Sequence, residues 1–259
     1  MRHSLLLTAA LLTTGMAALP AQQTSVNPPL YNGVQTHVDG LFVTPVAGAP
    51  FSATVLIRSE QTMPDGTTVT KTTINLIGRD SRGRIRNERR NLVPESFHGT
   101  PRLLEVHIFD PQTRMNTFYD PMTRIARQRV LPEPPKAPNL RSVSNPMMKV
   151  EDLESTNLDG YAATGLRRST TIPAQVSGTG APVTVVDEYW YSEDLHMNLL
   201  VVHTDPRSGV QTVALTGIKR EEPPQSLFEV PEGYKIVDVT PPPGAPAAFG
   251  GAVAGSPIR

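Results

Sequence analysis

Residues 51–77 read FSATVLIRSEQTMPDGTTVTKTTINLI and contain two β-strand patterns joined by one turn. Every second residue from Phe51 to Ile57 is apolar, which is the period expected for a strand with one buried face. A Met-Pro-Asp-Gly sequence follows at 63–66, where proline and glycine favour a tight turn. The residues after the turn are rich in threonine, valine and isoleucine, so this stretch predicts a β-hairpin.

Turns of one kind recur further along the chain. Asp-Pro-x-Thr-Arg occurs at 110–114 and 120–124, and Asp-Pro-Arg-Ser-Gly occurs at 205–209. Aspartate at the first position and proline at the second suit a type I turn, and the close spacing is typical of a meander. Residues 149–157 suit a strand or a short helix. Further strands are predicted at 84–92, 104–108, 114–119, 124–130, 161–172, 183–191, 198–204 and 210–219.

These segments predict an all-β fold, mainly antiparallel, in the form of a curved meander sheet or half-barrel with few short helices. The predicted organisation is a signal peptide at 1–21, a Pro/Gly-rich segment at 22–50, a β-rich domain at 51–240 and a disordered tail at 241–259. A Pro-rich loop at 131–146 interrupts the domain. The alternative is that this loop separates two small domains, each of which would bury little.

The start of the chain is typical of a secretory signal peptide. Arg2 and His3 precede an apolar run at 5–12, and Ala21 supplies a small residue for cleavage. The run is short for a membrane span, although an uncleaved anchor is the alternative. No later segment is apolar enough to cross a membrane, and the chain has no cysteine. We therefore expect an exported protein, periplasmic or extracellular, with no transmembrane segment in the mature chain.

Charge is balanced overall, with 24 basic and 24 acidic residues, but unevenly distributed. Residues 22–150 carry 16 Lys and Arg against 10 Asp and Glu, whereas the rest of the mature chain is acidic. The densest basic feature is an arginine cluster: Arg79, Arg82, Arg84, Arg86, Arg89 and Arg90. On one strand, Arg82, Arg84 and Arg86 would share a face. The cluster predicts a basic face that is solvated, protects a sheet edge, or meets an anionic partner.

The sequence contains no pattern that marks catalysis or metal binding. It has no His-x-His, no His-Glu-x-x-His and no Gly-x-Ser-x-Gly. The adjacent carboxylates Asp187 and Glu188 would point to opposite faces of a strand. We expect no catalytic residue, no metal site and no cofactor, and export with a neutral total charge disfavours nucleic acid as a partner. An enzyme would need a cleft in which Glu188, His203 or His107 converge.

Several phrases together resemble a family of uncharacterised exported bacterial proteins. They are RDSRGRIRNE at 79–88, DPQTR at 110–114, WYSEDL at 190–195, TDPRSG at 204–209 and SLFEVPEGYKI at 226–236. The last phrase is also similar to the closing strand of LolA/RseB-like periplasmic carriers and sensors. That resemblance implies a half-barrel with an apolar concave face and no assigned activity. Helices cover the concave face in those carriers, whereas the segment before Phe51 here is rich in proline.

Two hypotheses of function follow. The first is a non-catalytic binding protein of the cell envelope that holds a lipid or a lipoprotein acyl chain on its curved sheet. The second is a structural or protein-interaction scaffold, whose apolar face is closed by a second sheet or an envelope protein and whose arginines meet an anionic surface. Trp190, the single tryptophan, suits core packing or the wall of a ligand cavity. The predicted ligand-binding residues are Val55, Ile57, Val106, Ile108, Trp190, Leu200 and Val202.

Overall fold

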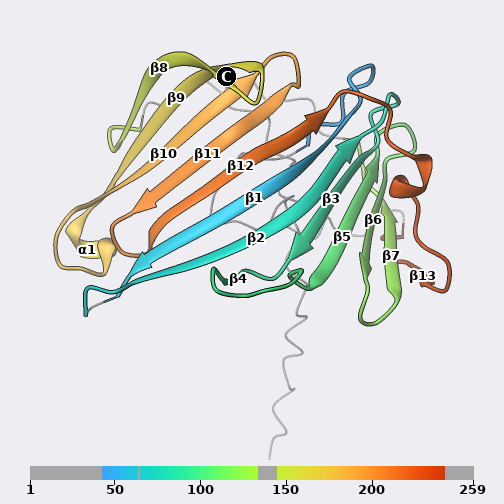
Figure 1. The fold of residues 1–259 in the computed structure, drawn as a ribbon, viewed down its shortest axis with the longest axis horizontal. Helices are drawn as coiled ribbons and strands as arrows, with labels where there is room; N and C mark the ends of the chain where they lie inside the picture. The colour runs from blue at the N-terminus through green and yellow to red at the C-terminus, as the bar shows by residue number, and fades with distance from the viewer. Residues whose placement is uncertain (1–42, 64, 134–144, 243–259) are drawn as a thin grey trace, which may run out of the picture.

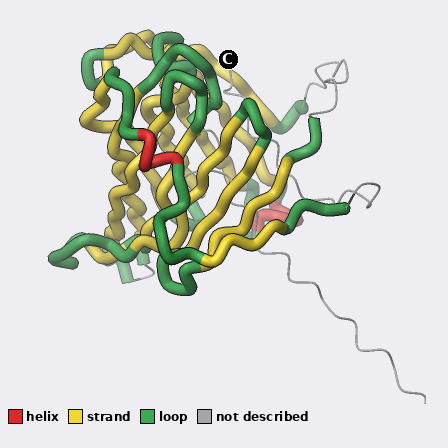
Figure 2. Tube along the Cα trace, turned by 90° about the vertical axis from the view of Figure 1, so that its right-hand side faces the viewer, coloured by secondary structure: helices red, strands yellow, loops and turns green. Residues whose placement is uncertain are grey.

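The computed structural model describes residues 43–63, 65–133 and 145–242, which form an open, curved β-sheet. Figure 1 shows the strands side by side across the molecule, and Figure 2 shows their curl after a turn of 90°. The prediction of an all-β, mainly antiparallel, curved sheet is therefore confirmed. The expected signal peptide, the expected tail beyond residue 242, and most of the loop at 131–146 lie outside the described residues.

The described residues up to 133 form seven strands. The opening hairpin is β1 (Phe51–Thr62) and β2 (Thr68–Arg79), as its alternation and its Pro-Asp-Gly turn predicted. The others are β3 (Ile85–Arg90), β4 (Val93–Pro94), β5 (Leu103–Asp110), β6 (Met115–Asp120) and β7 (Ile125–Val130).

The described residues 145–242 form six more strands and two helices of four residues each. Residues 149–157, which suit either a strand or a helix in the sequence, belong to a strand. The elements are β8 (Met148–Leu158), β9 (Tyr161–Ile172), α1 (Ala174–Ser177), β10 (Val183–Ser192), β11 (Met197–Asp205), β12 (Gly209–Lys219), η1 (Gln225–Phe228) and β13 (Lys235–Asp238). No helix within the described residues is long and apolar enough to cross a membrane.

The strands pair in the order β13-β7-β6-β5-β3-β2-β1-β12-β11-β10-β9-β8, and β4 adds a short pairing to β2. Among the described strands, β13 alone pairs in parallel, with β7 as its partner. The antiparallel pairing of β1 with β12 places strands from both sides of the loop at 131–146 in one sheet. The sheet does not close, because β8 and β13 are its two ends.

The three repeated Asp-Pro turns are built alike. The side chains of Asp110, Asp120 and Asp205 each accept a hydrogen bond from the backbone N–H two residues later. The fifth position has a positive φ in all three turns, and arginine occupies it twice, but in the third turn it is Gly209. A Cβ atom at Gly209 would collide with the backbone carbonyl of Glu60. The glycine is therefore required by close approach of β1 and not by the turn alone.

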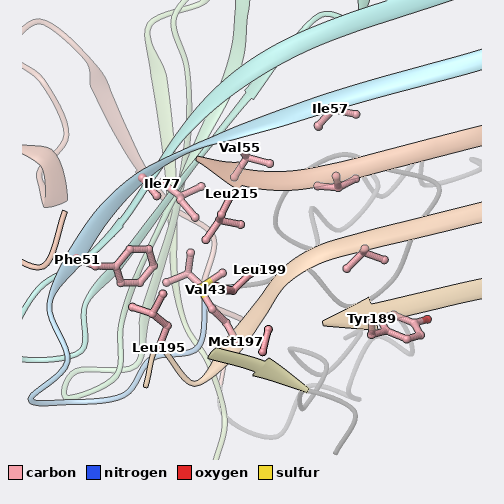
Figure 3. Close-up of a cluster of buried hydrophobic side chains, with 14 of the residues drawn as sticks. Val43, Phe51, Val55, Ile57, Ile77, Tyr189, Leu195, Met197, Leu199 and Leu215 are labelled. Carbon is pink, nitrogen blue, oxygen red and sulfur yellow. The ribbon is translucent and has the colours of Figure 1, made fainter. Parts of the chain in front are cut away.

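The main apolar core lies on one side of the sheet, which we call the Val55 face. The register of β1, β12, β11 and β10 places the buried apolar residues of this face side by side, and Figure 3 shows several of them pointing to the same side. Val43 and Leu195, from two loops, pack among them. The face is defined by Ala53, Val55, Ile57, Tyr189, Val201, Val213 and Leu215.

The opposite side, the Leu56 face, carries a second and smaller core over only part of its width. Val106 and Ile108 of β5, with Tyr119 of β6 and Ala126 of β7, are buried there. The closing segment of the chain covers them, with Phe228 of η1 at its centre. This segment continues into β13, which pairs with β7 and so ties the cover to the sheet.

Candidate functional site

A row of polar residues crosses the Val55 face next to its apolar core. Ile57, Val213 and Val201 are paired neighbours, and two residues further along their strands the side chains become polar. The backbone pairing aligns these polar residues one after another across β9, β10, β11, β12, β1 and β2. We call this set the polar row: Arg168, Asp187, His203, Gln211, Ser59 and Lys71.

Asp187 is the most connected member of the polar row. It is 7% exposed, and its Oδ1 lies 2.6 Å from Nδ1 of His203. Its Oδ2 accepts a hydrogen bond of 2.8 Å from Nη2 of Arg168, and the same nitrogen donates to the hydroxyl of Tyr189 at 2.7 Å. A buried carboxylate needs such partners, because burial removes it from water. The contact with Asp187 fixes the ring of His203 and leaves Nε2 as the nitrogen that a ligand can reach.

The polar row borders a cavity of about 310 Å³ at this end of the sheet. His203, Gln211, Ser59 and Lys71 all line it, so four of the six residues of the row face one space. The remaining wall combines small polar groups with apolar side chains. It consists of Gln61, Val69, Leu92, Ser208, Gly209 and Val210.

His107, which the sequence offered as a candidate catalytic residue, lies far from this cavity. In the sheet, β5 and β11 are separated by β3, β2, β1 and β12, so His107 and His203 do not converge. His107 donates or accepts a 2.6 Å hydrogen bond with Oδ1 of Asn116 and stacks on Phe118. Burial lowers the pKa of His107 to about 4, with the Asn116 contact opposing the shift.

Glu188 also faces away from the cavity. It lies on the Leu56 face, where its Oε1 contacts Nη2 of Arg167 at 2.6 Å, while Asp187 faces the other side. The prediction that this carboxylate pair would be split between two faces is confirmed. No group of three or more potential metal ligands occurs among the described residues. Within the described ranges, no serine hydroxyl forms a hydrogen bond with His203.

The predicted basic face is wrong as a single surface, because the six arginines do not lie together. Strand β3 begins only at Ile85, so Arg82 belongs to the preceding turn and does not share a strand face with Arg86. Arg86 and Arg90 point to the Leu56 face and flank Glu88, with an ion pair of 2.9 Å each. Both arginines share the one carboxylate of Glu88, and the cluster is divided between a turn and different faces of the sheet.

Three more members of the arginine cluster pair with Asp80 or Glu105. Arg84 contacts Asp80 at 2.6 Å and Arg82 approaches the same carboxylate at 3.7 Å, while Arg89 contacts Glu105 at 3.5 Å. Asp80 lies in the same turn as Arg82, and Glu105 is the cross-strand partner of Arg89 in the pairing of β3 with β5. The cluster therefore contributes internal ion pairs.

Arg79 is the exception, because it is completely buried and has backbone carbonyls as its partners. Its guanidinium donates to the carbonyl oxygens of Ala49 at 2.7 Å, Thr44 at 2.9 Å and Leu195 at 3.0 Å. It also lies over the ring of Phe51, 5.0 Å from the ring centre. Burial lowers the pKa of Arg79 to about 10, and the residue fastens two loops to the end of the Val55 face.

The seven predicted ligand-binding residues do not line one surface. Val55 and Ile57 belong to the Val55 face, where both are fully buried. Val106 and Ile108 lie on the opposite side, beneath the closing segment. The prediction of a common wall is wrong because it grouped residues by strand pattern without the register, and a shift of one residue moves a side chain to the other face. Whether any of them binds a ligand stays a prediction.

Trp190, Leu200 and Val202, the other three, lie on the uncovered part of the Leu56 face. Backbone pairing across β10, β11, β12, β1 and β2 aligns a row of apolar residues on this face. The row consists of Trp190, Leu200, Ala214, Leu56 and Ile74. Leu56 is 39% and Ile74 is 46% exposed. We call this row the apolar stripe; it differs from the region around Val106 in having no closing segment over it among the described residues.

Sequence reasoning missed four lining or supporting residues of the site: Asp187 as the partner of His203, and Ser59, Lys71 and Gln211 as lining residues. One signal was present, since Ser59 and Gln211 continue the alternation of Ile57 and Val213 on the same face. That signal becomes useful only when the order β2-β1-β12-β11-β10 is known. Pairing between strands so distant in sequence is not contained in any local pattern.

Comparison with known proteins identifies similar folds only. No family model and no curated protein matches the sequence. Among solved structures, an uncharacterised conserved protein from Thermus thermophilus is 14% identical with a TM-score of 0.40, over 74% of this chain and 91% of that one. A LolA superfamily protein from Nitrosomonas europaea is 9% identical with a TM-score of 0.28, over 72% of this chain and 92% of that one.

MucB, in its complex with MucA from Pseudomonas aeruginosa, is 11% identical with a TM-score of 0.40 over 73% of this chain, which spans 58% of that chain. The structures found thus include uncharacterised and LolA-type proteins, as the sequence phrases predicted. At these TM-scores the similarities say nothing of a ligand or partner, which have to be inferred from the residues of this chain.

Proposed function

We propose that the protein is a non-catalytic binding protein of the cell envelope that holds an apolar or lipid-like ligand on its curved sheet. One observation carries this proposal: a cavity of about 310 Å³ lies beside the buried apolar core of the Val55 face and is lined by polar and apolar side chains together.

The surroundings of the cavity support this proposal. Loops around Val43 and Leu195 pack at the end of the Val55 face near Phe51, and Leu92 packs against the same core. The opposite end is bordered by the polar row and opens into the cavity of about 310 Å³. An amphipathic ligand matches such a surface, because apolar walls with a few polar groups are typical of ligand sites.

Native mass spectrometry tests this proposal. The full chain would be expressed in a bacterial host, purified without denaturant, and measured both intact and after lipid extraction. We expect an acyl-chain species bound at close to one per protein. An apo mass that persists when the protein is incubated with fatty acids and phospholipids would overturn the proposal. Ile74→Ser, on the other face of the sheet, serves as a control and should keep the ligand.

A second function is favoured by the apolar stripe. Leu56, Ile74 and Leu76 are all more than a third exposed on the same side of the β1–β2 hairpin. Exposed apolar residues that gather on one face are typical of protein contact sites. A role as an interaction scaffold predicts that Ile74→Ser combined with Leu76→Ser abolishes a complex seen by chemical cross-linking in the envelope. Unchanged cross-linking would argue against this role.

A further inference from the structure

We infer that the cavity at the polar row binds the anionic end group, a carboxylate or a phosphate, of the proposed amphipathic ligand. This inference rests on the proposed function and deepens it, because it names the class of ligand. The cavity volume of about 310 Å³ is at the low end for ligand pockets, so it suits an end group and not a whole lipid.

The charges around the cavity favour an anion. Lys71 lines it and makes no ion pair within the described residues. The nearby carboxylates are already matched: Asp187 contacts Arg168 at 2.8 Å, and Asp205 contacts Arg207 at 2.7 Å. The ammonium of Lys71 is therefore the charge that a ligand can neutralise.

His203 provides a second, oriented contact for the same anion. Its Nδ1 is held 2.6 Å from Oδ1 of Asp187, and the side chain lines the cavity. Because Nδ1 faces Asp187, the opposite edge of the ring, with Nε2, is the edge that a ligand in the cavity can contact. Ser59, between Gln211 and Lys71 in the row, adds a hydroxyl that can donate to a second oxygen of a carboxylate or phosphate.

The cavity lies beside the apolar core and has some apolar wall of its own. Ser59 and Gln211 are each two residues from a fully buried apolar neighbour, Ile57 and Val213 respectively, on the same strand and face. Val69 and Val210 contribute apolar surface to the cavity itself. An end group seated beside Lys71 thus places the start of its attached chain against these apolar side chains.

Matched acid and ester probes test this inference. Cis-parinaric acid, a fluorescent fatty acid, and its methyl ester would be titrated into the full-length protein and two variants. Lys71→Met keeps most of the stem and removes the charge, and Lys219→Met, at the other end of the sheet beside Ser52, is the control. We expect Lys71→Met to weaken acid binding about tenfold and to leave the ester unchanged, with Lys219→Met without effect. His203→Gln should weaken acid binding about threefold on the same reasoning.

The outcomes separate the two proposals. If acid and ester bind wild type and Lys71→Met equally well, the inference is overturned while the apolar site stands. If neither probe binds, the proposed function fails and the inference fails with it. Acetate and inorganic phosphate, added as competitors, distinguish a free anion from an end group. Displacement of the acid but not of the ester by millimolar phosphate would reassign the cavity to a small free anion and overturn the end-group assignment.

Discussion

Two buried arginines fasten loops to opposite faces of this sheet, and they are satisfied in different ways. Arg79 on the Val55 face has neutral carbonyl oxygens as its acceptors. Arg86 on the Leu56 face has a counter-ion, since Nη2 lies 2.9 Å from Oε1 of Glu88, and it also donates to the carbonyl of Leu227 at 3.1 Å and to the hydroxyl of Tyr119. The loops on the Val55 face are thus held by an arginine whose acceptors are neutral, whereas the closing segment on the Leu56 face is held by an arginine in an ion pair.

The two faces also differ in which segments of the chain pack over them. On the Leu56 face, the closing segment carries Phe228 onto Val106 and Ile108 and then joins the sheet as β13. On the Val55 face, the loops held by Arg79 cover only the end near Phe51. The first region is a small core closed by its own segment, whereas the second ends beside the polar row at a cavity, which by our proposal holds a ligand.

The largest effect is expected from Arg79→Met, which retains bulk and removes the guanidinium. Three backbone carbonyls then lose their donor in a buried site, which we expect to lower the free energy of unfolding by about 4 kcal/mol. Urea denaturation followed by Trp190 fluorescence measures it. Arg82→Met is the control, since the Arg82 side chain is 50% exposed, and should change stability by less than about 0.5 kcal/mol. Equal effects would show that Arg79 does not hold the loops.

The second prediction concerns the cover of the smaller core. Phe228→Ala removes the buried ring at its centre and should cost about 3 kcal/mol. Because the segment is near the end of the sheet, hydrogen exchange should rise first at β13 and β7 and not at β1 or β12. Phe97→Ala, at a phenylalanine that is 47% exposed, is the control. Uniform loss of protection across the sheet would contradict the view that this core is a separate unit.

Much of the fold was readable from the sequence, for local reasons. The hairpin of β1 and β2 combines alternation with a Pro-Asp-Gly turn, and the Asp-Pro turns recur with the same side-chain hydrogen bond. These signals depend on neighbours in sequence, so they survive without a structure. The pairing of β1 with β12 depends on strands about 150 residues apart, and no local pattern encodes it.

The candidate site was harder to predict from the sequence, because it also depends on pairing between distant strands. Val55 and Val106 show the same alternation in sequence but lie on opposite faces, because face is decided by register. The arginine cluster was misjudged because Arg79 continues the Val55 face at the end of β2, whereas Arg82 lies in a turn. Composition indicates that charge is present, but only tertiary contacts decide whether it is exposed or internal.

The third prediction uses pH, through His107 behind the smaller core. The folded state holds the pKa of His107 at about 4, below the ordinary value of about 6.5 for an unfolded chain. Below the ordinary value the unfolded state binds the proton first, so stability should be complete above about pH 6.5 and fall by about 2 kcal/mol as pH drops toward 4. Urea midpoints measured from pH 7.5 to 4 would show this decline.

His107→Gln isolates that decline from other titrations. Burial raises the pKa of the neighbouring Glu105, which acts in the opposite direction because the folded state then retains its proton more strongly. The comparison of wild type with His107→Gln removes this shared contribution. A pH profile that keeps the same slope in the variant would show that the imidazole is not the group responsible.

The smallest effect is expected from Ile74→Ser on the apolar stripe, and it is the most direct test of the contrast within the Leu56 face. Ile74 is 46% exposed, so the change should alter the free energy of unfolding by less than about 0.5 kcal/mol. The same substitution at Ile108, which is 5% exposed under the closing segment, should cost about 3 kcal/mol. Thermal denaturation of both variants at equal concentration makes the comparison. A loss at Ile74 that approaches the loss at Ile108 would mean that a second copy or another part of the chain covers the stripe in solution, because an isoleucine already in contact with water has little burial to lose.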